Sequence, residues 1–169
     1  MTHWLQSRRH WPMANAALGV DVGLARVGVA ASDPSGILAT PVMTLRRDAK
    51  KNSDLRMLLR IIADRGVTEV FIGEPKSLAG NATESTKMAR DYAIALAQEA
   101  ASANIELEVF MVDERLSTVN AHRSLHASGK KMEDHRKVVD QVAATEILQQ
   151  VLEMRRNNVR VQASRIVLR

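Results

Sequence analysis

The sequence predicts an α/β fold in which a mixed β-sheet carries helices on both faces. The first apolar stretches are short and joined by turn residues, which is typical of antiparallel strands. Two later apolar runs, at 67–72 and 105–112, each follow a helical pattern, as parallel strands buried on both faces do. The resulting order, β-β-β-α-β-α-β-α-α, indicates one sheet that is partly antiparallel and partly parallel.

The first three strands are predicted from alternation and turn signals. Residues 18–22 and 27–32 alternate around a Gly-Leu-Ala-Arg turn, which predicts a hairpin. An Asp-Pro-Ser-Gly turn at 33–36 precedes a third strand at 37–40, which we expect Pro41 to end.

The helices are predicted from apolar periodicity and end signals. One helix begins at Asn52 or Ser53 and stops at Gly66, a residue that suits a left-handed helix end. A long, alanine-rich helix is expected at 83–102, with Asn104 just past its end. Two more helices are expected at 118–128 and 134–155, and an edge strand at 164–168.

The composition is that of one globular domain, with 169 residues, 46% of them hydrophobic and 25% charged. The absence of cysteine excludes disulfides, thiol nucleophiles and cysteine-based zinc sites. No apolar run approaches the roughly 20 residues that span a membrane, and the first residues lack the apolar core of a signal peptide. We therefore expect a cytoplasmic protein with no membrane partner.

The net charge of +5 arises at the two ends of the chain. Residues 1–16 and 156–169 are basic and contain no acid, whereas the part between them is nearly neutral. We therefore expect a folded domain at 17–155, between a basic, flexible N-terminal tail and a basic C-terminal tail. Such tails either keep a protein in solution or attract polyanions such as nucleic acid.

Acidic residues stand at positions where an apolar strand or its end would not require them. Asp21 interrupts the first strand, on the face that also carries Gly19 and Gly23, so another backbone or a ligand could approach it closely. Asp113 and Glu114 directly follow another apolar strand, at its carboxyl end. Each position has an ordinary explanation, as a turn cap or as a strand-to-helix connection.

Asp140 is a further misplaced acid, on the last predicted helix. Apolar residues recur at helical spacing between 143 and 152, and Asp140 extends that stripe toward the sheet unless this first turn overhangs solvent. A divalent cation would explain all these acids together, because two carboxylates about 4 Å apart repel by about 4 kcal/mol at an effective dielectric near 20. Mg²⁺ or Mn²⁺ fits, since both prefer oxygen ligands and retain waters and substrate phosphates.

Four blocks of the sequence occur together between residues 17 and 153. They are Leu-Gly-Val-Asp-Val-Gly at 18–23 with Arg-Val-Gly-Val-Ala at 26–30, Val-Phe-Ile-Gly-Glu-Pro at 70–75, Asp-Glu-Arg-Leu-Ser-Thr at 113–118, and Arg-Lys-Val-Val-Asp-Gln-Val-Ala-Ala at 136–144. In kind, order and spacing, these blocks resemble the YqgF/RuvX family of Holliday junction resolvases and pre-ribosomal-RNA nucleases. Glu74 departs from the family, which usually has leucine there, so it either joins the site or alters substrate contacts.

The resemblance implies an RNase H-like nuclease that uses Mg²⁺ or Mn²⁺ and acts on the 5′ end of precursor small-subunit rRNA or on branched DNA. Its catalytic acids would be Asp21, Asp113 and Asp140 as metal ligands, with Glu114 sharing a ligand or replacing Asp113. Resolving a junction would also require two symmetry-related active sites, hence a homodimer. Residues expected to contact the nucleic acid are Arg26, Lys76, Asn81, Arg115, Arg136 and Lys137.

Two other functions stay open from the sequence. ATP-binding proteins related to actin, sugar kinases and Hsp70 also use Asp-x-Gly on an opening hairpin, but they usually carry Ser or Thr where this chain has Leu24, and they contain two such domains. A non-catalytic nucleic-acid-binding or ribosome-assembly module of the same fold would bind RNA without metal and cleave nothing.

Overall fold

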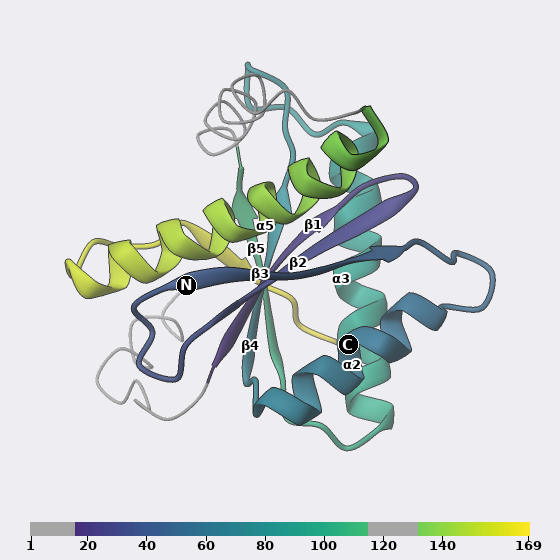
Figure 1. The fold of residues 1–169 in the computed structure, drawn as a ribbon, viewed down its shortest axis with the longest axis horizontal. Helices are drawn as coiled ribbons and strands as arrows, with labels where there is room; N and C mark the ends of the chain where they lie inside the picture. Colours follow the sequence, from purple (N-terminus) through teal and green to yellow (C-terminus); the bar gives the residue numbers. More distant parts are fainter. Residues whose placement is uncertain (1–15, 115–131) are drawn as a thin grey trace.

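Six strands form a single sheet in the computed structural model, which describes residues 16–114 and 132–169 (Figure 1). The order of strands in the sheet is β3-β2-β1-β4-β5-β6. The strands are β1 (Ala17–Val22), β2 (Arg26–Ser32), β3 (Ala39–Arg46), β4 (Glu69–Glu74), β5 (Glu108–Asp113) and β6 (Ala163–Arg165). The helices in the described ranges are α2 (Ser53–Arg65), α3 (Glu84–Ser102) and α5 (Met132–Arg156).

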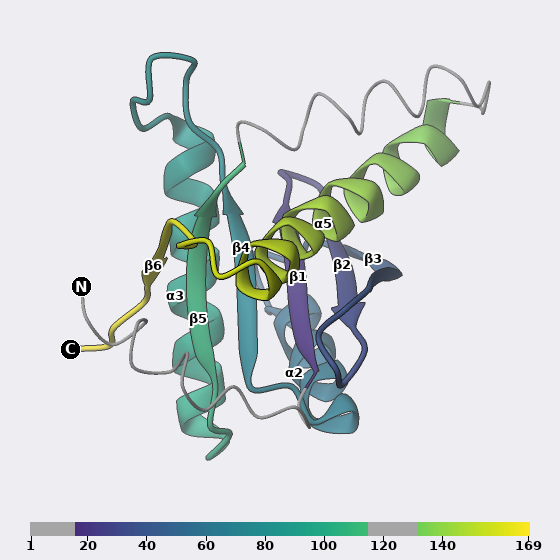
Figure 2. The same ribbon diagram turned by 90° about the vertical axis from the view of Figure 1, so that its left-hand side faces the viewer.

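The sheet is mixed, which confirms the prediction from the sequence. Strands β1, β2 and β3 form an antiparallel meander, whereas β1, β4 and β5 run parallel to one another. The last strand, β6, pairs antiparallel with β5. The carboxyl ends of β1, β4 and β5 therefore meet at one edge of the sheet, at the top of Figure 2, which is called the carboxyl edge below.

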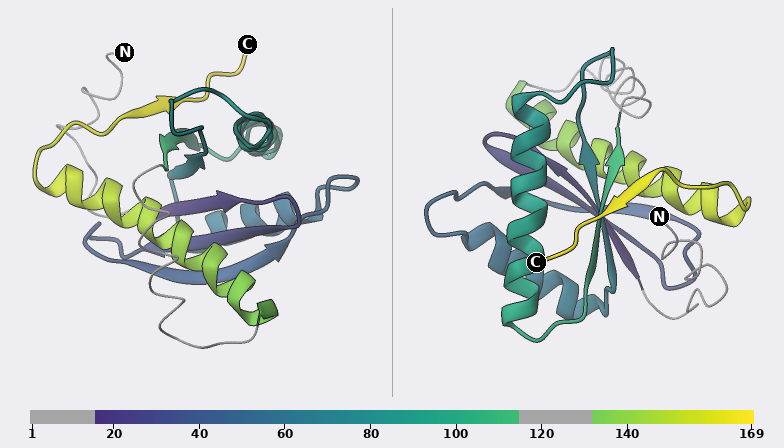
Figure 3. Two further views of the ribbon diagram at one scale, coloured as in Figure 1. Left: turned by 90° about the horizontal axis from the view of Figure 1, so that it is seen from above. Right: turned by 180° about the vertical axis from the view of Figure 1, so that it is seen from behind.

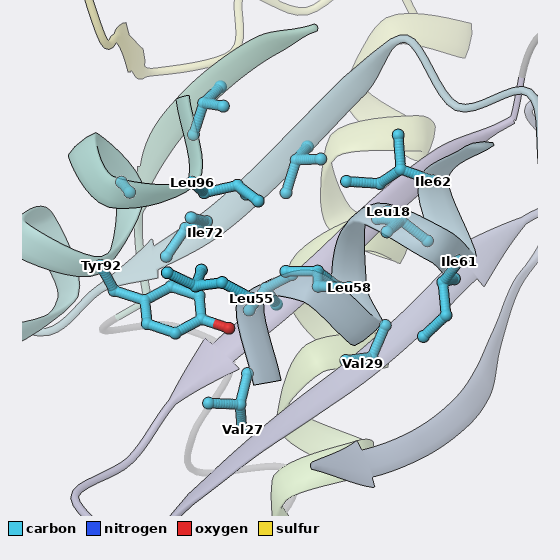
Figure 4. Packing of buried hydrophobic residues seen from close by; sticks show 14 of the residues in the cluster. Leu18, Val27, Val29, Leu55, Leu58, Ile61, Ile62, Ile72, Tyr92 and Leu96 are labelled. Atoms are coloured by element: carbon cyan, nitrogen blue, oxygen red, sulfur yellow. The ribbon is translucent and has the colours of Figure 1, made fainter. Parts of the chain in front are cut away.

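Helices cover both faces of the sheet, as predicted. Helix α5 crosses one face, and α2 and α3 lie on the other (Figures 2 and 3). Between the sheet and α2 and α3 lies a large apolar core, in which Leu18, Leu58 and Ile62 pack together (Figure 4). Under α5 lies a second core, where the rings of Phe71 and Phe110 stack with centroids 5.3 Å apart. Successive residues of a strand thus point alternately into the two cores.

Strand β3 continues through Pro41, so the prediction that this proline ends the strand is wrong. Because β3 is an edge strand, a residue without a backbone N–H interrupts no central ladder. The β2–β3 register shifts between Val29 and Ala30, and Ala30 is the residue that faces Pro41. A bulge next to the proline therefore accommodates it without ending the pairing.

The helix ends follow most of the predicted signals. Gly66 ends α2 with a left-handed φ of 63°, and Asn104 adopts a φ of 56° just past α3. Thr83 caps α3, since its side-chain oxygen accepts a hydrogen bond from the backbone N–H of Thr86. Asn52 stands at the N-cap of α2, but its side chain makes no capping hydrogen bond.

After α5 the chain returns to the sheet and adds β6 beside β5. This strand confirms that an edge strand lies near the C-terminus, but it spans Ala163–Arg165 and not the predicted 164–168. Part of the stretch expected as a basic C-terminal tail thus belongs to the sheet. The helix predicted at 118–128 lies outside the described residues. None of the helices in the described ranges has the length and apolar character needed to cross a membrane.

Candidate active site

Asp21 lies near the carboxyl end of β1, on the face of the sheet that α5 covers. Its strand neighbours Val20 and Val22 point into the opposite core. A Cβ atom on Gly19 would lie 2.7 Å from Leu148 Cβ, so the glycine allows α5 to pack directly on β1. The sequence predicted that a backbone or a ligand could approach closely beside Asp21. At Gly19, the backbone that approaches is that of the protein's own helix α5.

Glu114 reaches the same face from the end of β5. A Cβ atom on Gly73, in the intervening strand β4, would overlap Oε2 of Glu114, so the carboxylate lies directly over that glycine. Strand β4 separates β5 from β1, and across it Glu114 shares a hydrogen bond with Asp21. The two acids therefore form a partly buried pair.

Helix α5 positions Asp140 against β2. A Cβ atom on Gly28 would overlap the backbone oxygen of Asp140, so helix and strand touch at this residue. Arg26 Nε donates a hydrogen bond of 3.1 Å to Asp140 Oδ2, and the charge of Asp140 also acts on Asp21. Acids from β1, the end of β5 and α5 thus form one cluster at the carboxyl edge, which is called the acid cluster below.

Burial is the main influence on the protonation of the acid cluster. Burial first, and then the charges of Glu114 and Asp140, raise the pKa of Asp21 to about 8. Burial also raises the pKa of Glu114, against the hydrogen bond with Asp21, and the pKa of Asp140, against the guanidinium of Arg26. Near neutral pH, the Asp21–Glu114 pair therefore retains a proton whose place a cation could take.

Asp113 belongs to the other face of the sheet. Phe110 and Val112 pack under α5, whereas Met111 packs on the side of α2 and α3, so alternation directs Asp113 away from the acid cluster. Glu114 instead continues the series of Phe110 and Val112. Alternation along the sequence places Asp113 and Glu114 on opposite faces, but which of these faces carries Asp21 depends on the side of the sheet that α5 covers.

A hollow of about 480 Å³ lies on that other face, between the end of β4 and the segment that leads into β6. Asp113, Glu74, Lys76 and Arg160 line it. Arg160 was not among the predicted site residues, because nothing in the sequence around it indicates that the C-terminal segment returns to the sheet here.

Glu74 also lies outside the acid cluster, although it ends a strand beside it. Its side chain is 6% exposed and accepts hydrogen bonds from Arg90 Nε at 3.0 Å and Arg90 Nη2 at 3.2 Å. Lys76 Nζ lies 3.1 Å from Glu74 Oε1. Burial alone would raise the pKa of Glu74, but Arg90 and Lys76 outweigh it and lower the pKa below its usual value. Glu74 is therefore a partner of two cations.

The basic residues predicted to contact nucleic acid are distributed around the carboxyl edge. Arg26 is bound to Asp140 and Lys76 to Glu74, while Asn81 is exposed in the loop after β4. Arg136 and Lys137 belong to the first turns of α5, shortly before Asp140, but nothing is described of their side chains. Arg115 lies outside the described residues.

The acid cluster has the chemistry of a divalent-metal site, because carboxylate oxygens are the ligands that Mg²⁺ and Mn²⁺ prefer. Its geometry is not yet that of such a site. Within residues 16–114 and 132–169, no three acidic or histidine side chains form a group that could hold a metal ion. Asp140 is instead engaged by Arg26. The donor atoms of the cluster therefore suit a divalent cation, while one of its three carboxylates is paired with Arg26.

Comparison with known proteins identifies close relatives in sequence. A family model described as "RuvX: Holliday junction resolvase" matches residues 15–154. A protein of Clavibacter sepedonicus is 48% identical over 139 residues, and one of Mycobacteroides abscessus is 42% identical over 145 residues. Both carry the name "Putative pre-16S rRNA nuclease". The alignments cover 82% and 86% of this chain, and 83% and 85% of the relatives.

The fold is similar to that of a solved resolvase. The structure of T. thermophilus RuvC in complex with a Holliday junction substrate matches with a TM-score of 0.51, covering 90% of this chain and 99% of that one. The two sequences are 11% identical, so the likeness concerns the fold alone. It confirms the RNase H-like architecture that the sequence blocks implied.

Proposed function

Because the chain belongs to the RuvX family, we propose that it is a metal-dependent nuclease that hydrolyses phosphodiester bonds of precursor 16S rRNA. The observation that carries the proposal is the partly buried cluster of Asp21, Glu114 and Asp140. Ligands of open α/β sheets bind at the carboxyl ends of the strands, where this cluster lies. Buried acids that lack enough cations destabilise a fold, which supports a role in binding a cation.

Each acid has a distinct task in the proposed site. Asp21 and Glu114 share a hydrogen bond, and a bound cation would take the place of its proton, which would be released to solvent. Asp140 supplies the third carboxylate from α5, and Glu114 is better placed than Asp113 to share a ligand with it. When bound, Mg²⁺ or Mn²⁺ supplies positive charge beside the attacking and leaving oxygens of the phosphodiester.

Precursor rRNA is favoured over branched DNA as the substrate. The relatives named for the rRNA activity are 42% and 48% identical over most of the chain. Likeness to the RuvC–junction complex extends only to the fold. A four-way DNA junction therefore stands second, and a non-catalytic RNA-binding module third.

The proposal predicts that the full chain cuts precursor 16S rRNA near its 5′ end when Mg²⁺ or Mn²⁺ is present. Four-way DNA junctions and duplex DNA are the alternative substrates in the same panel, and EDTA gives the metal-free control.

Glu114→Gln is expected to slow cleavage by more than about a hundredfold, and the adjacent Asp113→Asn by less than about tenfold. Equal losses would contradict the choice of Glu114. RNA binding without cleavage in any metal would support the non-catalytic module instead.

Glu74→Gln is expected to leave the cleavage rate within about threefold of wild type, because its carboxylate lies on the face opposite Asp21. The substitution weakens the pairing with Arg90 and Lys76, so the free energy of unfolding should fall by about 1 kcal/mol. Cleavage assays and urea unfolding measure the two effects separately. A hundredfold loss of cleavage with unchanged stability would place Glu74 in the site.

A further inference from the structure

We propose that Arg26 is the resident counter-cation of Asp140, that a divalent metal ion displaces it, and that the released guanidinium then binds a phosphate of the nucleic acid. This role rests on the metal-dependent nuclease proposed above. It assigns a second cation to the site, supplied by the protein itself, and predicts an exchange between the two cations.

The contact that must open is the ion pair between Arg26 and Asp140. Arg26 Nε lies 3.1 Å from Asp140 Oδ2, and the two side chains are 28% and 16% exposed. In the described part of the chain, no other side chain donates a hydrogen bond to Asp140. Arg26 therefore supplies the positive charge that Asp140 would otherwise take from a metal ion.

The three acids lie close together, and one of them, Asp140, is paired with Arg26. Asp21 and Glu114 are already hydrogen-bonded, and Asp140 is close enough for its charge to act on Asp21. Even so, the described residues include no group of three such side chains that could hold a metal. A divalent ion bound to Asp140 would repel the guanidinium whose Nε lies 3.1 Å from Asp140 Oδ2, so metal binding weakens the contact between Arg26 and Asp140.

The surroundings of Arg26 favour movement of its side chain alone. Its backbone oxygen accepts a hydrogen bond of 2.8 Å from the N–H of Gly23, which anchors the residue at the start of β2. The sheet register sets Arg26 opposite Arg46 of β3, so two like charges begin on the same face. Once released, the planar guanidinium can donate two parallel hydrogen bonds to a phosphate at the carboxyl edge.

The first measurement is Mn²⁺ binding to the metal-free full chain by isothermal titration calorimetry, with no nucleic acid present. Arg26→Gln is expected to bind Mn²⁺ on the order of tenfold more tightly than wild type, because the metal no longer displaces a charge-assisted ion pair. Arg26→Lys keeps the charge without the planar fork and should fall between the two. Circular dichroism verifies that each variant is folded.

Arg46→Gln is the matched control for this measurement. It removes the same charge from the position directly opposite on β3, but it leaves the contact between Arg26 and Asp140 intact. Arg46 is exposed, so its effect on Mn²⁺ affinity is screened and should stay below about threefold.

The second measurement is cleavage at saturating Mn²⁺, where Asp140 is released in every variant. Arg26→Gln is expected to lower kcat/KM on the order of tenfold through loss of the phosphate contact, although it binds the metal more tightly. Unchanged kcat/KM would overturn the phosphate contact. Unchanged or weaker Mn²⁺ binding by Arg26→Gln would overturn the exchange, while leaving the nuclease proposal intact. A wild-type chain that neither binds Mn²⁺ nor cleaves would overturn the nuclease proposal and the exchange together.

Discussion

Asp21→Asn is expected to abolish cleavage, by more than about a hundredfold, and yet to make the metal-free protein more stable. The loss of activity follows because an amide cannot replace the carboxylate that a divalent cation needs. The gain in stability follows because burial and the charges of Glu114 and Asp140 oppose ionisation of Asp21. An asparagine of the same size avoids that ionisation.

The gain in stability should depend on pH in a defined direction. The pKa of Asp21 is about 8 in the folded protein, against an ordinary value of 3.8. Below the ordinary value both states are protonated, so Asp21 has no effect. As the pH rises from about 4 toward 8, the unfolded state loses its proton first, and the wild type loses stability relative to Asp21→Asn. The difference should reach a few kcal/mol, on the order set by the size of the shift, and stay constant above pH 8.

Urea unfolding of both proteins in EDTA, at intervals from pH 5 to pH 9, measures this difference. With Mn²⁺ added, the wild type should become more stable than Asp21→Asn, because the metal ion stabilises the wild type and not the variant. Asp64→Asn, at an exposed position on α2, is the matched control and should change neither cleavage nor stability by more than about 0.5 kcal/mol. A difference that shrinks as the pH rises would contradict the proposed environment of Asp21.

Gly28→Ala is expected to lower the free energy of unfolding by about 3 kcal/mol and to slow cleavage by about a hundredfold. The added Cβ atom would overlap the backbone oxygen and carbonyl carbon of Asp140, and would lie 2.9 Å from its Cβ. Backbone atoms cannot rotate aside, so α5 must lift from β2. That movement displaces Asp140 relative to Asp21, and a displacement of about 1 Å is enough to impair catalysis.

Gly66→Ala separates backbone strain from this steric effect. Gly66 has a left-handed φ of 63°, and nothing lies within 4 Å of an added Cβ atom. The substitution should therefore cost about 1 kcal/mol in stability and leave cleavage unchanged, because Gly66 lies just before the amino end of β4, at the edge of the sheet opposite the acid cluster. Urea unfolding and cleavage rates of both variants provide the comparison. A fully active Gly28→Ala would mean that α5 need not touch β2 for function.

Much of the fold could be predicted from the sequence because local patterns carry it. Alternation at 18–22 and 27–32 predicted the hairpin, and the apolar runs at 67–72 and 105–112 predicted parallel strands displaced by only a few residues from β4 and β5. The prediction that Pro41 ends β3 was wrong, because a proline ends a strand only where the neighbouring strand needs a hydrogen bond from the missing N–H. Whether β3 lies at an edge depends on the order of strands, which no local pattern records.

The candidate site was predictable in its parts but not in its assembly. Asp21, Glu114 and Asp140 were among the acids selected, because each stands beside apolar residues at a strand or helix position. Asp113 and Glu114 could not be separated until α5 was known to cover the face of Phe110 and Val112. The attachment of Glu74 to Arg90, and of Arg26 to Asp140, likewise joins residues distant in sequence.

The sequence by itself determined the order of the elements, the apolar face of each, and the presence of acids at the carboxyl ends of strands. These properties follow from the periods of strands and helices, which every short stretch expresses on its own. Only the tertiary structure decided which acids share a face of the sheet. It also decided that Arg26 of β2 is the ion-pair partner of Asp140 on α5. Those choices depend on which helix packs on which side of the sheet, and on charges brought together from residues more than a hundred positions apart.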